Sequence, residues 1–496
     1  MYPPPDRTGT RRDLTDSADP GAWRTEHADK AALIVDAQDY FRIARRAMMN
    51  AREQVMLIGW DFDTRIWLDP SKPDDGAPWK LGPFISWLAD NRPNLCINIL
   101  TWDIGAAKLF GRGTTLLRLA QWASSPRIIF QVDATHPVGG SHHQKIVVID
   151  DSLAFCGGID MTADRWDTRE HRDRDDRRKR PFTRRRYMPW HDATMALEGD
   201  VAKALGELSR DRWELASGKT LPVPKTHDEV WPRGLEPHFT DLPVTIARTR
   251  GETDVLPQIR EIEAQFVAMI RDTKRFAYIE TQYFASRAIA EAIAARLDEP
   301  DGPEFLLVNP RVADGWLEEF VMGAARAVLV EELGKRLHPE RFRIFTPVTT
   351  AGEDIYVHAK ISIVDDMILR VGSANMNNRS MGLDSECDVT IDARDGNAAG
   401  ATTIAGIRAD LMAEHLGVDV AAVEASFART GSLIATVDEL RGAGKTLAPF
   451  VVPETSGFEV AMADSQALDP EHPDQAFEPT AKRRLLRRLN RTRKRR

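Results

Sequence analysis

The sequence lacks the features that mark membrane-spanning and disulfide-bonded exported proteins. It has no run of about 18 apolar residues, so no membrane-spanning helix is expected. The stretch from Met1 to Asp19 lacks the apolar segment of a Sec signal peptide. Its only cysteines, Cys96, Cys156 and Cys387, have no metal-ligand spacing, and we expect buried free thiols in a reducing compartment. These absences predict a cytoplasmic or peripheral-membrane protein, and export by a route other than Sec stays open.

The net charge is unevenly spread along the chain. The net charge of the 496 residues is −8, yet Lys482 to Arg496 holds ten Lys or Arg and no acid, so the remainder carries −18. Proteins that bind nucleic acid gain most of their affinity by neutralising phosphates, so nucleic acid is an unlikely partner for this acidic body. A phosphate-binding site, if present, has to be built locally. The length suits two domains with extensions.

An internal repeat is the clearest positive signal. The segment from Ser141 to Asp150 is echoed by the segment from Tyr356 to Asp365. Counted from the histidine that opens each motif, the matching pairs are His143 and His358, Lys145 and Lys360 at +2, Asp150 and Asp365 at +7, Gly157 and Gly372 at +14, Gly158 and Ser373 at +15, and Asp160 and Asn375 at +17. Agreement at so many positions in one register indicates that the two halves are related.

Each copy of the repeat predicts a β-hairpin. The residues 145–149 and 360–364 form short β-branched runs, an Asp-Asp turn follows, and a second apolar run (153–156 or 368–371) ends at glycine. Because His and Lys stand two residues apart on a strand, they point to the same face.

Strands alternate with helices around both hairpins, which predicts an α/β fold with helices flanking a sheet. Pro, Gly and charged residues interrupt this periodicity near Ser217 to Pro237 and predict the boundary between the halves. The expected strands outside the hairpins are 54–60, 95–101, 127–132, 275–280, 304–308 and 341–345, and the expected helices are 37–51, 114–123, 288–297 and 317–337.

The paired histidines and lysines suit the cleavage of a phosphodiester. One imidazole attacks phosphorus, the other protonates the leaving oxygen, and the lysines bind the non-bridging oxygens. This chemistry requires no metal and no cofactor, and the sequence has no acidic cluster at convincing metal-ligand spacing. A single His-x-Lys is weak evidence, but its duplication with the same downstream glycine makes the functional interpretation the favoured one.

The two motifs closely resemble the paired HKD motifs of the phospholipase D superfamily, and the resemblance covers roughly residues 30 to 440. Flanking strings such as Pro189-Trp190-His191-Asp192 and 278–284 are similar to those of eukaryotic-type phospholipases. The resemblance implies two α/β domains in pseudo-twofold arrangement, with the active site at their interface and a covalent phosphohistidine intermediate. The predicted organisation is an N-terminal extension (1–29), a first domain (30–217), a linker (218–238), a second domain (239–446) and a C-terminal extension with the basic tail (447–496).

The resemblance also implies roles for individual residues. His143 is assigned as the nucleophile and His358 as the general acid and base, although the reverse assignment fits the same sequence. Asp192 and Glu386 match the acids that orient the two imidazoles. The lysines Lys145 and Lys360, with Ser373 and Asn375, are expected to bind the phosphoryl oxygens. Asp150 and Asp365 complete the catalytic motifs, where we expect them to stabilise the hairpin turns, and Asp160 is expected to pair with a lysine or to be protonated.

The leading interpretation is a monomeric phospholipase D that acts on glycerophospholipids. The alternatives are a phosphatidyltransferase like cardiolipin synthase, a phospholipase effector or toxin, and a nuclease, which the acidic body disfavours. The basic tail, with Leu485, Leu486 and Leu489 on one side of a possible helix, fits weak attachment to an anionic membrane. Non-specific nucleic-acid binding or a merely solubilising tail stays open. The charged run 169–186 is expected to be a solvated insertion, or else a loop that meets anionic head groups.

Overall fold

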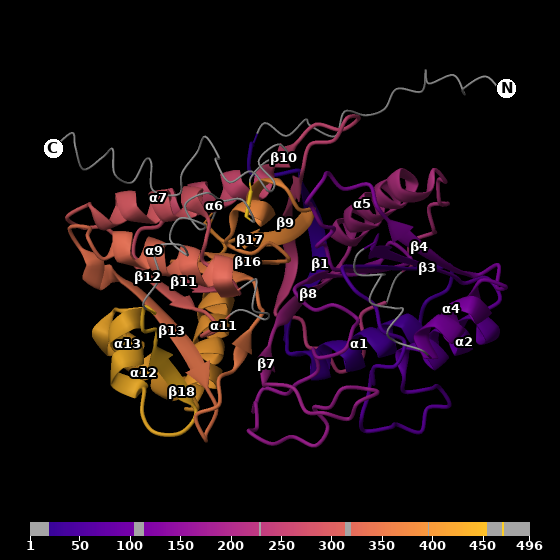
Figure 1. The fold of residues 1–496 in the computed structure, drawn as a ribbon, viewed down its shortest axis with the longest axis horizontal. Coiled ribbons are helices and arrows are strands. Elements are labelled where there is room, and N and C mark those ends of the chain that lie inside the picture. The colour runs from indigo at the N-terminus through magenta and orange to yellow at the C-terminus, as the bar shows by residue number, and fades with distance from the viewer. Residues whose placement is uncertain are drawn as a thin grey trace.

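The computed structural model describes residues 19–103, 114–227, 230–312, 319–394, 396–453 and 469–470. In these ranges one continuous sheet runs through both halves of the chain (Figure 1). Its strands are β1 (Arg24–Val35), β2 (Gln54–Gly59), β3 (Cys96–Trp102), β4 (Ile128–Asp133), β5 (Ile146–Ile149), β6 (Leu153–Gly157), β8 (Ala193–Glu198), β9 (Phe239–Arg250), β10 (Ile259–Arg260), β11 (Phe276–Glu280), β12 (Glu304–Val308), β13 (Phe342–Val348), β15 (Ile361–Val364), β16 (Ile368–Gly372), β17 (Glu386–Asp392) and β18 (Thr446–Pro449).

The strand order repeats about the centre of the sheet. The order is β18-β13-β12-β11-β15-β16-β17-β9-β1-β8-β6-β5-β2-β3-β4, with β10 paired to β9. In each half three parallel strands are followed by the antiparallel hairpin that carries the motif. The long strands β1 and β9 pair antiparallel in the middle. This order agrees with the pseudo-twofold arrangement that the family resemblance implies.

Helices cover both faces of the sheet (Figure 1). One face packs against α5 (Asp200–Ser217) and α11 (Ala398–Leu416), which share a single hydrophobic core across the two halves. The opposite face has a separate core in each half. The remaining helices are α1 (Ala37–Met49), α2 (Leu81–Asn91), α4 (Thr114–Trp122), α6 (Glu261–Asp272), α7 (Arg287–Leu297), a π-turn at Glu319–Gly323, α9 (Ala324–Leu333), a 3₁₀ turn at Pro339–Arg341, α10 (Asn378–Gly382), α12 (Val420–Thr430) and α13 (Leu433–Leu440). The predicted α/β class is confirmed.

The hairpins follow from their sequence pattern. On β5 the side chains of Ile146 and Val148 enter the shared core, while Val147 and Ile149 enter the core on the other face, as the pleat of a strand requires. The turn residues Asp150 and Asp151 have φ values of 50° and 49°, and Asp365 and Asp366 have 55° and 57°. Aspartate tolerates this left-handed region better than β-branched residues do. The predicted strands, hairpins and helices are confirmed to within a few residues in the described ranges.

The first strand begins earlier than the predicted start of the first domain at residue 30. Strand β1 begins at Arg24, so residues 24–29 belong to the central sheet rather than to a separate extension. Its first half is polar and half-exposed, and so carries no apolar run that would reveal a strand in the sequence. Because one sheet joins the halves, the division into two domains stays a prediction. The basic tail lies outside the described residues. Among the described helices, none combines the length and the apolar character needed to cross a membrane.

Candidate active site

The two motif histidines are held by carboxylates from the opposite half of the chain. His143 Nδ1 lies 3.0 Å from both carboxylate oxygens of Glu386, at the start of β17. His358 Nδ1 lies 2.7 Å from Asp192 Oδ2, which follows the short strand β7 (Trp190–His191). Strand β7 pairs in parallel with β14 (Tyr356–Val357), which brings Asp192 beside the second motif. This crossed arrangement assembles one site from both halves.

The crossed pairs fix which imidazole nitrogen faces the site. Asp192 and Glu386 are fully buried and, as carboxylates, accept hydrogen bonds from Nδ1–H. The Nε2 atom of each ring is then left to act on a substrate. Glycine at position 158 makes room for this geometry, because a β-carbon there would collide with the Asp192 carboxylate. Steric exclusion of any side chain therefore explains why glycine occupies position +15 of the first motif.

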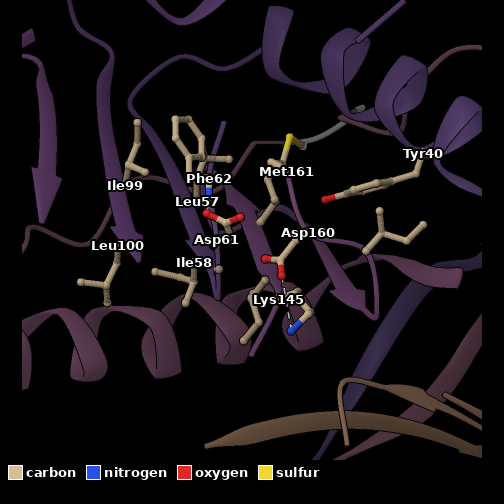
Figure 2. A pocket seen from close by; sticks show the side chains of 14 residues that line it. Tyr40, Leu57, Ile58, Asp61, Phe62, Ile99, Leu100, Lys145, Asp160 and Met161 are labelled. Carbon is tan, nitrogen blue, oxygen red and sulfur yellow. Dashed lines mark hydrogen bonds and ion pairs between the residues drawn. The ribbon is translucent and has the colours of Figure 1, made fainter. Parts of the chain in front are cut away.

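Both motif lysines are buried beside the histidines. Lys145 Nζ donates to the carbonyl oxygen of His143 at 2.7 Å and lies 3.5 Å from Asp160 Oδ2. Figure 2 shows the side chains of Lys145 and Asp160 directed toward each other. Lys360 Nζ donates to the carbonyl oxygen of His358 and lies 3.5 Å from Gln282 Oε1. Asp160 thus pairs with a lysine, which is one of the two roles expected for it. Its other oxygen accepts from the amide of Trp60 at 3.0 Å.

Burial and mutual repulsion control the charges in the site. Burial, reinforced by the nearby charge of Lys145 and opposed by Asp192, lowers the pKa of Lys360 to about 7. Burial also lowers the pKa of His358 well below its usual range, and Lys360, Arg165, Lys145 and His143 act in the same direction. Basic side chains therefore lie close together in the site. Because the pKa values of Lys360 and His358 are lowered, the site carries less positive charge than the same side chains would carry in water. Such a cluster is poised to accept an anion.

Glu386 is stabilised as a carboxylate by several donors. Burial raises its pKa, but His143, Lys145 and a hydrogen bond from Ser373 outweigh burial and lower the pKa overall. Ser373 Oγ donates to Oε2 at 2.6 Å, and Ser380 Oγ donates to Oε1 at 2.7 Å. The single hydroxyl hydrogen of Ser373 is thus used by Glu386, and a direct bond from it to phosphate would require the hydroxyl to rotate. Ser380 is a supporting residue that the sequence analysis did not identify.

Asn375 and the residues around His358 complete the site. Asn375 is buried, and its Oδ1 has no hydrogen-bond partner among the described residues. The Trp190 ring lies 5.1 Å from the His358 ring and 4.6 Å from the Tyr356 ring, between centroids. The Arg165 guanidinium lies 4.3 Å above the Trp190 ring. Arg165 and Gln282 could not be identified from the repeat, because neither has a counterpart at a fixed offset in it.

The two motif aspartates bind backbone rather than the reacting groups. Asp150 accepts from the amides of Arg52, Glu53 and Gln54 at 2.7 to 2.9 Å. Asp365 accepts from the amides of 274–276 at 2.7 to 3.0 Å. Each therefore ties its hairpin turn to the segment that leads into the strand beside the hairpin, β2 for Asp150 and β11 for Asp365. These contacts agree with the expected turn-stabilising role and give no support to direct catalysis.

We expect Asp150→Ala to lower the free energy of unfolding by about 2–4 kcal/mol, because three backbone donors lose a charged acceptor. Urea denaturation measures this loss. Asp150→Asn is the matched control: it retains an acceptor for the two amides that bond to Oδ1, and should cost clearly less. A large loss of turnover in Asp150→Ala with unchanged stability would contradict the structural role.

Comparison with known proteins agrees with this geometry. The family model described as Phospholipase D matches residues 324–440, which contain the second motif. The chain is 26% identical over 414 residues to phospholipase D A of Dictyostelium discoideum, covering 70% of this chain and 32% of that protein. It is 25% identical over 500 residues to phospholipase D1 of Schizosaccharomyces pombe, covering 79% and 36%. The chain belongs to the phospholipase D superfamily.

Membership of this superfamily supports a phosphodiesterase. The chain spans about a third of the length of the two curated relatives just named. Among solved structures, phosphatidylserine synthase of Haemophilus influenzae Rd KW20 matches with a TM-score of 0.49 and 12% identity, over 76% of this chain and 85% of that one.

Proposed function

We propose that the protein is a phospholipase D, which hydrolyses the head-group phosphodiester of glycerophospholipids to phosphatidic acid. The observation that carries this proposal is the crossed pairing of His143 with Glu386 and of His358 with Asp192, with a lysine beside each imidazole. Two oriented imidazoles and two lysines supply the nucleophile, the proton donor and the anion-binding charge that a phosphodiester requires.

The proposed reaction has two steps. In the first, His143 Nε2 attacks phosphorus, a P–N bond forms, and the bond from phosphorus to the head-group oxygen breaks as His358 gives that oxygen a proton. In the second, His358 takes a proton from water, the resulting oxygen attacks phosphorus, and the P–N bond breaks to release His143. An alcohol that replaces water in the second step gives transphosphatidylation.

The positions of the histidines support this assignment of roles. The side chain of His143 is 16% exposed and that of His358 is 7% exposed, so His143 is the more accessible ring. Burial and the surrounding cations disfavour the protonated form of His358. A bound phosphodiester carries negative charge that offsets these cations, so substrate binding itself promotes the proton donor.

The test measures release of choline and ethanolamine from phosphatidylcholine and phosphatidylethanolamine vesicles, beside a single-stranded DNA substrate and a phosphatidylglycerol substrate for lipid-to-lipid transfer. Head-group release that leaves phosphatidic acid supports the proposal. Formation of a lipid dimer without phosphatidic acid would favour the transferase, and cleavage of DNA alone would favour the nuclease. A folded protein inactive on all four substrates would exclude the proposed reaction on these lipids.

Activity should depend on pH through Lys360. Its pKa near 7 means that the free protein loses a phosphate-binding charge as the pH rises through neutrality. We therefore expect kcat/KM, which reports the free enzyme, to decline above about pH 7. Bound phosphate favours the charged lysine, so the corresponding decline of kcat should lie at higher pH. Initial rates from pH 5.5 to 9 at low and saturating substrate measure both profiles, and a kcat/KM that is flat from pH 6 to 8.5 would contradict this expectation.

The surface supports contact with an anionic membrane, which we propose as the setting of the reaction. Within the charged run 169–186, His171, Asp175 and Arg178 are buried, while most of the other residues are exposed. Residues 182–186 are exposed, and in the sequence Phe182 is followed closely by Arg184, Arg185 and Arg186. An exposed aromatic ring beside basic residues suits the head-group region of a bilayer.

A further inference from the structure

A buried cluster of histidines and carboxylates lies next to the active site, and the proposed reaction does not use it. It contains one group from each of four distant parts of the chain: Asp36, His171, His191 and Glu414. Asp36 precedes α1, His171 lies in the charged run, His191 ends β7, and Glu414 lies on α11. One ligand atom from each lies within 4.8 Å of all the others, and all four residues are buried.

We infer that these four residues form a structural binding site for a divalent cation of the Zn²⁺ class. Each offers an atom of the right chemistry: imidazole nitrogen from His171 and His191, and carboxylate oxygen from Asp36 and Glu414. Two nitrogens with two carboxylate oxygens suit zinc rather than calcium or magnesium, which prefer oxygen alone. Four protein ligands leave no open position, and closed sites of this kind are structural.

The distances between the ligand atoms fit a tetrahedral ion. Glu414 Oε1 lies 3.0 Å from His171 Nε2 and 3.0 Å from His191 Nδ1. Asp36 Oδ2 lies 3.5 Å from His171 Nε2. In a tetrahedron with bonds of about 2.0–2.1 Å, neighbouring ligand atoms lie roughly 3.3 Å apart. These three of the six distances between ligand atoms bracket this value, and the other three are within 4.8 Å.

The second nitrogen of each histidine is already oriented as in a metal site. His171 Nδ1 lies 3.1 Å from Asp167 Oδ2, and His191 Nε2 lies 2.8 Å from Glu280 Oε2. Metal-binding histidines almost always donate their other ring N–H to a carboxylate or carbonyl, which turns the free nitrogen to the ion. Here both outer nitrogens face carboxylates, and both inner nitrogens converge on Glu414.

Asp36 supplies the independent sign of a missing partner. Its side chain is 1% exposed, and its Oδ2 has no hydrogen-bond partner among the described residues. Aspartate at the residue before a helix ordinarily caps the first turn, but Asp36 makes no such side-chain bond to α1. Instead Oδ1 accepts from the Asp192 amide at 3.2 Å, and Oδ2 is turned toward His171.

The ion would connect the two halves beside the catalytic acid. Three of its ligands come from the first half, and Glu414 comes from the second. His191 directly precedes Asp192, and its carbonyl oxygen accepts from the His358 amide at 2.8 Å. Holding His191 therefore holds the backbone that presents Asp192 to His358, while the ion itself takes no part in the reaction.

The full-length protein, purified with zinc and then freed of unbound metal, should contain about one zinc per chain by elemental analysis. Asp36→Asn keeps the size of the side chain and the bond to the Asp192 amide but removes a charged ligand, and should weaken zinc binding at least about a hundredfold. Asp410→Asn is the matched control, because Asp410 bonds to Arg169 beside the cluster but offers the ion no ligand. Its zinc content should equal that of the wild type.

Prolonged chelation should lower the thermal midpoint of the wild type by several degrees, zinc should restore it, and Asp36→Asn should show neither change. In a network held by protons alone, the neutral amide of Asp36→Asn is tolerated and zinc has no effect. A folded wild type that retains no zinc and gains no stability from it would overturn the inference. Equal zinc binding by wild type and Asp36→Asn would also overturn it. Neither measurement uses the lipase assay, so the outcome is independent of the proposed function.

Discussion

His143→Ala and His358→Ala are each expected to reduce head-group release at least about 10⁴-fold, and to differ in the step that they block. Residues that act as one catalytic unit lose nearly all activity when either is removed. The difference emerges on a phosphatidic acid ester of a nitrophenol, which leaves without a proton. On that substrate His358→Ala should still form the P–N bond and release one equivalent of nitrophenol in a burst, because His143 remains. His143→Ala should give no burst.

The covalent intermediate can be detected directly in these variants. Acid-labile, base-stable phosphate on the protein, located by mass spectrometry of the peptide that contains 143, supports His143 as the nucleophile in His358→Ala. The opposite pattern, with the burst in His143→Ala and the label at 358, would exchange the two roles. His338→Ala, which removes a partly exposed histidine that lies outside both motifs and pairs with Glu340, is the control for the general effect of losing a histidine.

The repeat predicted the hairpins because its signal is local. The strand residues 146–149 and the Asp-Asp turn are adjacent in the chain, so propensity and spacing suffice to place them. The crossed pairing of His143 with Glu386 joins residues 243 positions apart and was reached only through the family resemblance. The first half of β1 escaped prediction because its polar residues are half-exposed and its place in the sheet is decided by pairing with β9.

The candidate metal site shows the same limit more sharply. Asp36, His171, His191 and Glu414 share no short spacing, and the sequence analysis found no cluster suited to a metal. Their convergence depends on β7 crossing to the second half and on α11 packing against the shared core. A fixed spacing in the sequence can identify metal ligands that lie on one helix, strand or loop. Ligands that come from four separate segments can be identified only from the three-dimensional structure.

Glu386→Gln is expected to lower kcat by about 10² to 10⁴, with little change in KM. A carboxylate-to-amide change beside a catalytic histidine has effects of this size because it reverses the tautomer. Each oxygen of Glu386 now accepts from His143 and from one hydroxyl, Ser373 or Ser380. In glutamine one of these atoms becomes an NH₂ group. Where this NH₂ group faces Nδ1 of His143, it donates a hydrogen bond to that nitrogen. The proton of the imidazole ring is then on Nε2, the nitrogen that has to attack phosphorus.

Ser380→Ala separates this effect from simple loss of a hydrogen bond. It removes one donor to Glu386 but leaves the carboxylate and the tautomer of His143 intact, so a loss of less than about tenfold is expected. Steady-state rates on vesicles, with circular dichroism to verify folding, give both values. If Glu386→Gln and Ser380→Ala lose activity equally, Glu386 acts by packing and not by fixing the proton. If only Glu386→Gln loses most of its activity, the carboxylate of Glu386 from the second half determines which nitrogen of His143, from the first half, carries the proton.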